Sequence, residues 1–312
     1  MKNSTTNFFL LAVTTLLFVG CEKEITPEKV AFVPQLVVEG YIDYSEGQVF
    51  PTPTYVILTK SVDFFSKIDS TTYAGIFERK ADVRVSDGTN EVKLRELCSD
   101  ELTASELALA QQFLGNILPK QKFCVYLDTT LTMNGVQGKS YTLKIVTQDG
   151  KKISSIATVP QLVKLDSLWY RSVPDPNSRD LKEVMCRLTD PVAVRNNYHF
   201  LTKRGANPFN SGGLFDDAII NGTQVTFPIQ RASERNEETD VRTFGYFFNG
   251  DTVQVQWKCF DRAQFDFWQT DRASASGNGP FSTFVRIKSN IVGGLGIWGA
   301  SSTKTYQIIL PK

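Results

Sequence analysis

Histidine is almost absent from this chain of 312 residues, which contains only His199. One histidine excludes metal sites built from several imidazoles, and it leaves any Ser-His-Asp site with a single base. No two cysteines lie two to four residues apart, so the spacing of a thiolate metal site is missing as well. Residues 197–201 around His199 have the composition of a strand. We therefore expect no cofactor, no resident metal and no enzymatic activity.

The chain also has no excess of positive or negative charge, with 34 Lys and Arg against 33 Asp and Glu. Lys2 is the one charged residue in the N-terminal apolar segment. A nucleic-acid-binding domain needs clustered basic residues, so we expect no nucleic-acid partner. No later apolar run approaches the roughly 20 residues that span a bilayer, so we expect no membrane span after the N-terminus.

The N-terminus has the pattern of an export signal. Lys2 precedes an uncharged run, Phe8 to Val19, and Gly20 and Cys21 follow it. A cysteine directly after a small residue resembles a bacterial lipobox, which implies cleavage before Cys21 and acylation of its sulfur. Acyl chains contribute about 0.8 kcal/mol per buried CH₂, so several of them would hold the protein on a membrane. The alternative is an ordinary secreted protein in which Cys21 is incidental. We expect a signal peptide over residues 1–20 and a tether over residues 21–34.

Residues 35–162 have the pattern of a β-sandwich. Short apolar segments such as Leu36–Ile42 and Tyr55–Thr59 recur about every ten residues and are separated by turns. Asp87-Gly88 and Asp149-Gly150 are typical hairpin turns, and alternating apolar residues flank both. We therefore predict an N-terminal immunoglobulin-like domain in an all-β fold.

One helical insert is expected within this domain. Thr103 and Glu106 form a capping box, and Gly115 is suited to end the helix. Cys98 and Cys124 stand on either side, and a disulfide between them would stabilise the fold by about 3 kcal/mol.

Residues 163–312 are expected to form a second β-rich domain with one short helix. Cys186 and Cys259 each fall on the apolar face of a predicted strand, so we favour a disulfide between them, with two buried thiols as the alternative. Without Cys21, four cysteines allow three pairings, and all remain open. Asp261 is placed to cap a helix that carries Phe265, Phe267 and Trp268, and closing strands are expected at Phe284–Ile287 and Tyr306–Leu310.

Residues 294–299 match the pattern G-x-G-x-x-G. A dinucleotide site needs this loop between a strand and a helix, with an acidic residue about 20 positions later. Here a β-like segment follows, and the sequence stops 13 residues after Gly299. We therefore expect tight turns or a bulge where two backbones approach closely.

Acidic and aromatic residues supply the remaining candidates for a binding site. Asp216 and Asp217 are candidate calcium ligands, although the alternating oxygen spacing of a calcium loop is absent. Glycoside hydrolysis needs two carboxyl groups a fixed distance apart, and Asp216, Asp217, Asp261 and Asp266 are the candidates for that pair. Neighbours on a strand face opposite sides, so adjacent aromatic residues are either buried on two sides or form an exposed shelf for a ligand. These residues are Phe64, Phe65, Tyr246, Phe247 and Phe248.

A series of short motifs, in order along the chain, resembles one known family. The motifs are Val37–Gly40, Asp190-Pro191, Asn197-Tyr198, Phe215–Asp217, Asn221-Gly222, the helix around Phe265–Trp268, Gly279–Phe281 and Ser289–Gly299. Together they resemble a family of outer-membrane lipoproteins of Bacteroidota known only as domain of unknown function 4249. The ending Asn-Ile-x-Gly-Gly-Leu-Gly is the most specific motif, and Trp298 stands where family members tend to have Phe.

The resemblance implies a location and a partner rather than a reaction. Such lipoproteins are often encoded beside TonB-dependent transporters, so we expect a lipid-anchored accessory subunit that helps such a transporter to capture a nutrient. The alternatives are a free-standing surface adhesin or glycan-binding lipoprotein and, least favoured, a surface hydrolase. The sequence names no ligand among small molecules, peptides and glycans. We expect the protein at the cell surface, and the periplasmic face of the outer membrane is the alternative.

Overall fold

The structure is a computed structural model that describes residues 31–47, 52–63, 66–105, 122–192, 194–234, 237–238, 240–276 and 285–312. Contacts divide the chain into Met1–Val33 and Pro34–Lys312, and all the elements below belong to the second unit. The predicted signal peptide, Cys21 and most of the tether lie outside the described residues. So do Phe64, Phe65 and most of the predicted helical insert.

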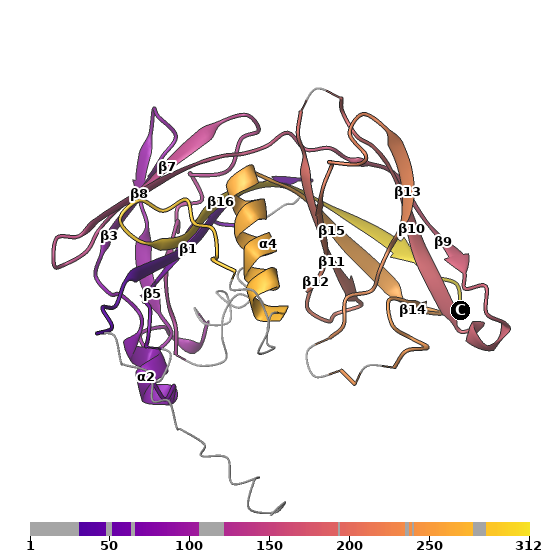
Figure 1. Ribbon diagram of the computed structural model, residues 1–312, viewed down its shortest axis with the longest axis horizontal. Helices are drawn as coiled ribbons and strands as arrows, with labels where there is room; N and C mark the ends of the chain where they lie inside the picture. Colours follow the sequence, from indigo (N-terminus) through magenta and orange to yellow (C-terminus); the bar gives the residue numbers. More distant parts are fainter. Residues whose placement is uncertain are drawn as a thin grey trace, which may run out of the picture. The chain divides into compact units, whose positions relative to one another are not determined.

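The described chain is mainly β, as the sequence predicted, and its strands form three sheets (Figure 1). The largest has eight strands in the order β12 (Asn210–Asp216), β11 (Asn197–Arg204), β15 (Thr252–Phe260), β16 (Leu295–Ile309), β1 (Leu36–Glu46), β2 (Tyr55–Lys60), β6 (Cys124–Leu127) and β5 (Arg95–Cys98). The second contains β4 (Glu91–Lys93), β3 (Asp82–Ser86), β7 (Ser140–Val146) and β8 (Lys152–Thr158). In the third, β10 (Leu181–Thr189) pairs with β13 (Gln224–Ile229), β14 (Phe247–Phe248) and β9 (Leu165–Ser172). Within the described residues, the helices are α2 (Ser70–Gly75), the 3₁₀ helix Pro176–Ser178 and α4 (Arg262–Ser276).

Each smaller sheet packs against one part of the eight-stranded sheet. Alternate residues of β1, such as Val38 and Ile42, meet β3 and β7 in one buried cluster. Trp257 of β15 is the largest side chain of the second cluster, where its ring stacks on Tyr198 at 5.1 Å. These clusters fall on either side of the predicted domain boundary at residue 162, except that the segment from Ile291 onward contributes to both. The eight-stranded sheet itself is continuous across that boundary.

The cysteines behave differently in the two parts. Cys98 and Cys124 face each other on β5 and β6 and form the expected disulfide. The disulfide that the sequence favoured between Cys186 and Cys259 is wrong, because both are buried free thiols. Their sulfurs turn to separate backbone acceptors, Phe227 O at 3.5 Å and Val163 O at 3.7 Å. Burial raises the pKa of each thiol to about 12.

The C-terminal segment also departs from prediction. Residues 285–287 of the predicted strand Phe284–Ile287 form no strand, whereas β16 begins at Leu295 and is 15 residues long. The side chain of Asn290 bonds to the backbone of β16 where a neighbouring strand would otherwise do so. It accepts from Trp298 N at 3.0 Å and donates to Trp298 O at 2.7 Å. These two bonds fix the preceding segment beside β16 without a backbone ladder.

The glycine-rich run lies in β16 rather than in a phosphate-binding loop. Gly296 pairs with Val38 of β1 and has φ +103°, and a Cβ built on it would lie 1.9 Å from Val38 O. The expected close backbone approach is therefore confirmed, with a turn just before it at Gly293, whose φ is +85°.

Candidate functional site

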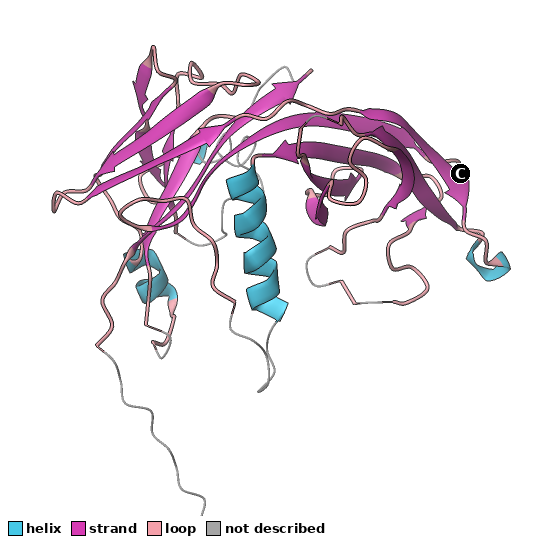
Figure 2. Ribbon diagram, turned by 45° about the horizontal axis from the view of Figure 1, so that its top comes forward, coloured by secondary structure: helices cyan, strands magenta, loops and turns pink. Residues whose placement is uncertain are grey.

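Helix α4 lies on one face of the eight-stranded sheet (Figure 2). A pocket of about 780 Å³ lies on that face. Strands β1, β2, β11, β15 and β16 contribute to its floor, while α4 and the segments around residues 52 and 207 contribute to its sides. Its volume is in the range of small-molecule sites. The residues that line the pocket include Glu39, Tyr41, Asp43, Tyr55, His199, Leu201, Lys203, Lys258, Phe260, Gln264, Trp268 and Ser301.

The period-two alternation of the strands puts polar groups on this face. On β1, Glu39, Tyr41 and Asp43 alternate with Val38 and Ile42, which lie in the core. On β15, residues 256, 258 and 260 line the pocket, and residues 255, 257 and 259 are buried on the other side. The floor is thus the polar half of strands whose apolar half holds the sandwich together.

Helix α4 begins at the edge of the pocket. Asp261 caps it, as predicted, by accepting from Gln264 N at 2.7 Å, and its other oxygen accepts from Ala300 N at 3.2 Å. Burial raises the pKa of Asp261 to about 7. A Cβ at Gly299 would lie 2.9 Å from the Gln264 side chain, so Gly299 permits the close packing of α4 on β16.

A buried carboxylate joins the central strands of the floor. Asp43 Oδ1 accepts from Ser301 Oγ and Thr303 Oγ1, both at 2.6 Å. Lys258 Nζ lies 3.8 Å from the same oxygen. The charges of Asp43 and Lys258 therefore offset each other within the floor.

One end of the pocket combines carboxyl groups with aromatic rings. Burial raises the pKa of Glu39, and the negative charge of Asp271 on α4 raises it further. Burial and the charge of Glu39 raise the pKa of Tyr41 well above its usual range. The rings of Tyr41 and Tyr55 are 5.7 Å apart, and Trp268 of α4 also lines this pocket.

The histidine lies on β11, where its ring packs 5.1 Å from Phe260. Arg272 Nη2 lies 3.2 Å from His199 Nε2, and Ser211 Oγ lies 2.9 Å from it. A guanidinium only donates, so Nε2 must accept and the proton of the neutral ring must be on Nδ1. Burial lowers the pKa of His199 to about 3, and the charges of Arg272 and Lys258 add to the effect. His199 is therefore a neutral hydrogen-bonding group near pH 7.

Three pocket residues have buried polar atoms with unused hydrogen-bonding capacity. Tyr41 Oη, His199 Nδ1 and Gln264 Oε1 have no hydrogen-bond partner among the described parts of the chain. The side chains of His199 and Gln264 belong to β11 and α4 and are 9% and 4% exposed. By the tautomer above, His199 Nδ1 is a donor; Gln264 Oε1 is an acceptor, and the Tyr41 hydroxyl can do either.

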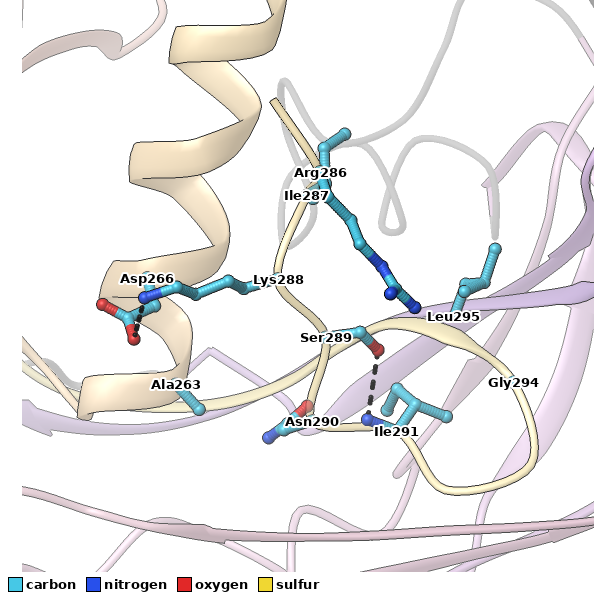
Figure 3. Close-up of a pocket in the computed structure, with 10 residues that line it drawn as sticks. All are labelled: Ala263, Asp266, Arg286, Ile287, Lys288, Ser289, Asn290, Ile291, Gly294 and Leu295. Atoms are coloured by element: carbon cyan, nitrogen blue, oxygen red, sulfur yellow. Dashed lines mark hydrogen bonds and ion pairs between the residues drawn. The ribbon is translucent and has the colours of Figure 1, made fainter. Parts of the chain in front are cut away.

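A second pocket, of about 600 Å³, lies between α4 and residues 286–295 (Figure 3). Lys288 crosses it to reach Asp266, with Nζ 3.0 Å from Oδ2, and Ser289 Oγ accepts from Ile291 N at 3.2 Å. Arg262 also pairs with Asp266, at 2.8 Å. The carboxylate of this pocket is thus already paired with two basic residues. Asp261 and Asp266 have separate roles, as a helix cap and an ion-pair partner.

The candidate calcium ligands hold loops in place. Asp217 is fully buried and accepts from Asn196 N at 2.8 Å, and Arg195 lies 3.5 Å from its other oxygen. Asp216 pairs with Arg262 at 3.6 Å. Among the described residues, a grouping of three potential metal ligands occurs at Glu96, Cys98 and Cys124, but the two sulfurs form the disulfide.

The three adjacent aromatic residues Tyr246, Phe247 and Phe248 favour burial over an exposed binding shelf. Phe247 is fully buried in the second core, so an exposed binding role for it is wrong. Tyr246 and Phe248 are half-buried. The guanidinium groups of Arg204 and Arg231 lie over the Phe248 ring, at 5.2 and 5.9 Å from its centre.

The pocket is not evident from the sequence. Glu39, Tyr41 and Lys258 give no signal of a site, because a polar residue at every second strand position usually faces solvent. Gln264 is one polar residue on a helix and gives none either. A usable signal was the helix capped by Asp261, since it has to cover some part of a sheet. His199 was noticed only as the single histidine.

Comparison with known proteins shows that the chain matches a known family. The chain matches the family described as "Domain of unknown function (DUF4249)" over residues 22–307. No curated protein matches it. Within the described residues, no helix has the length and apolar character needed to cross a bilayer.

Proposed function

Starting from the fact that the chain belongs to the DUF4249 family, we propose that it is a lipid-anchored ligand-binding protein of the outer membrane. In this role it serves a TonB-dependent transporter as an accessory subunit and does not act as an enzyme. The observation that carries the binding function is the 780 Å³ pocket with an unpartnered donor on His199 and an unpartnered acceptor on Gln264.

Unpartnered buried polar atoms are costly. Each costs about 1–3 kcal/mol, and native proteins contain only a few of them. Three such atoms around one pocket, on β1, β11 and α4, are accounted for when a ligand supplies the missing partners. The ligand must then both accept and donate hydrogen bonds.

Binding is favoured over catalysis by the state of the histidine. A pKa of about 3 makes His199 a weak base near pH 7, and Arg272 and Ser211 occupy its accepting nitrogen. The buried carboxyl of Asp261 is engaged by backbone donors at the start of α4. These groups are arranged to hold a molecule rather than to transfer its protons.

The anchor and the partner rest on the N-terminal sequence and on the family resemblance. Cys21 directly after Gly20 supports lipid attachment, and a binding protein held on the membrane can pass its ligand to a neighbouring channel. The alternative of a free-standing surface adhesin shares the anchor and differs in lacking the transporter.

The test is extraction of the tagged protein from its native outer membrane in gentle detergent. We expect an acylated peptide at Cys21, a β-barrel transporter in stoichiometric amount, and a small molecule that denaturation releases. Leu201→Trp should fill the pocket and abolish the small molecule, whereas Ile309→Trp, at a strand position 66% exposed, should retain it. Recovery of the protein alone, without transporter or small molecule, would refute the proposal.

A further inference from the structure

The acidic end of the pocket has no ion pair at its carboxyl groups. Among the described residues, no Lys, Arg or His forms an ion pair with Glu39 or Asp271, although the charge of Arg272 acts on its neighbour Asp271, and Asp43 has Lys258 nearby. Glu39 is on the floor and Asp271 is on α4, close enough for the charge of Asp271 to raise the pKa of Glu39. Two carboxyl groups thus repel each other where burial already disfavours charge.

Aromatic rings surround this end. Tyr41 adjoins Glu39 along β1, Tyr55 pairs with Tyr41 across the strands, and Trp268 lines the same pocket from α4. Aromatic faces attract cations by about 0.5–2 kcal/mol, increasingly so when water is excluded. We call Glu39, Tyr41, Tyr55 and Trp268 the Glu39 corner.

An independent observation comes from Gln264. Its side chain packs on Gly299, which pairs directly with Tyr41, so the amide lies beside the Glu39 corner. The residue is 96% buried and lines the pocket, and its Oε1 acceptor has no partner in the described chain. The Glu39 carboxyl, the unpartnered Gln264 Oε1 and the aromatic faces suit a donor that carries positive charge, and the Tyr41 hydroxyl, also unpartnered, can accept from it.

We propose that the Glu39 corner binds a cationic nitrogen group of the ligand, an ammonium or a guanidinium. This assignment rests on the proposed binding function and specifies its ligand class. An organic cation fits better than a metal ion, because the described residues offer no group of three potential metal ligands here and because the walls are aromatic. Lys203 and Lys258 line the pocket from β11 and β15 and would face the remainder of the ligand.

The experiment compares two probes that differ in one charge. Nα-acetyl-lysine methylamide carries an ammonium, and its Nε-acetyl form is neutral. Calorimetric titration of the full-length wild-type protein at low salt should show binding of the first at least tenfold tighter than of the second. Glu39→Gln should weaken binding of the charged probe at least tenfold. The same change at Glu238, an exposed carboxyl that does not line the pocket, should alter the affinity less than twofold. Affinity for the charged probe should rise with pH as Glu39 loses its proton, and the rise should occur above the usual range of a carboxyl because burial raises the pKa of Glu39.

The melting temperature of unliganded Glu39→Gln distinguishes a loss of binding from a loss of folding. A carboxyl with a raised pKa costs the folded state stability once it ionises, so Glu39→Gln should raise the melting temperature, and more at pH 8 than at pH 4. A structural role for Glu39 would instead lower it.

Three outcomes would overturn the assignment. They are equal binding of the two probes, undiminished binding to Glu39→Gln, and calcium chloride binding at this site in place of the amine. If neither probe binds while a small molecule is still lost in Leu201→Trp, the binding function stands and the cation assignment falls. If the small molecule is missing as well, both fall.

Discussion

Replacement of Gly296 by alanine tests whether the glycine-rich run is structural. Gly296 has φ +103° within β16, and the added Cβ would lie 1.9 Å from Val38 O of β1. Real Cβ contacts stay beyond 3.0 Å, so the two strands would have to separate by about 1 Å. Gly150→Ala is the matched control, because Gly150 has φ +82° with nothing within 4 Å of its Cβ.

The difference between the two variants isolates the steric contact. The positive φ alone costs an alanine about 1–2 kcal/mol, which is the whole effect expected for Gly150→Ala. Overpacking adds about 1–3 kcal/mol at Gly296, and each weakened ladder hydrogen bond adds about 1 kcal/mol. We therefore expect Gly296→Ala to cost about 4 kcal/mol, a large share of the roughly 5–15 kcal/mol by which a domain is stable.

Urea unfolding followed by tryptophan fluorescence measures both variants. Gly296→Ala should lose at least 2 kcal/mol more than Gly150→Ala, and nucleotide addition should leave the wild-type midpoint unchanged. Equal losses in the two variants, or a rise of the wild-type midpoint with a dinucleotide, would refute the structural account of the run.

Three further predictions concern buried titratable groups. In a chain that begins after Cys21, Cys186 and Cys259 should resist a thiol reagent in the native state and react as two thiols after unfolding without reductant; fewer than two would indicate a second disulfide. Asp261 has a pKa of about 7, above its ordinary value, so the free energy of unfolding should fall as pH rises from about 4 to 7, by roughly 4 kcal/mol at most. In urea titrations, Asp261→Asn should remove this dependence of the unfolding free energy on pH. His199 has a pKa of about 3, below its ordinary value, so stability should fall as pH drops from about 6.5 toward 4, and an unchanged slope in His199→Gln would contradict this.

Local patterns predicted the local elements well. The alternation of Val83 and Val85, the turn at Asp87-Gly88 and the cap at Asp261 all occur as expected, because each depends on residues close in sequence. The Cys98–Cys124 disulfide was also expected, since the two residues are only 26 positions apart.

Long-range arrangement was beyond such patterns. The sequence pointed to two domains. It could not show that β16 would pair with β15 on one side and with β1 on the other, where Leu295 of β16 pairs with Val37, 258 residues earlier. The same limit applies to Cys186 and Cys259, whose apolar faces were predicted correctly while their orientation toward separate carbonyl groups was not.

The pocket escaped prediction for a related reason. The alternation that identifies a core face labels the other face only as polar, and the distinction between solvent and a pocket depends on what covers it. Helix α4 covers that face because Gly299 permits close contact with Gln264, a pairing across 35 residues.

The most direct test of the central claim is a crystal structure of the protein purified from its native membrane. We expect a bound molecule in the 780 Å³ pocket that accepts from His199 Nδ1, donates to Gln264 Oε1, and places a cationic nitrogen beside Glu39. A pocket closed by its own side chains, with those two atoms bonded within the protein, would contradict the account.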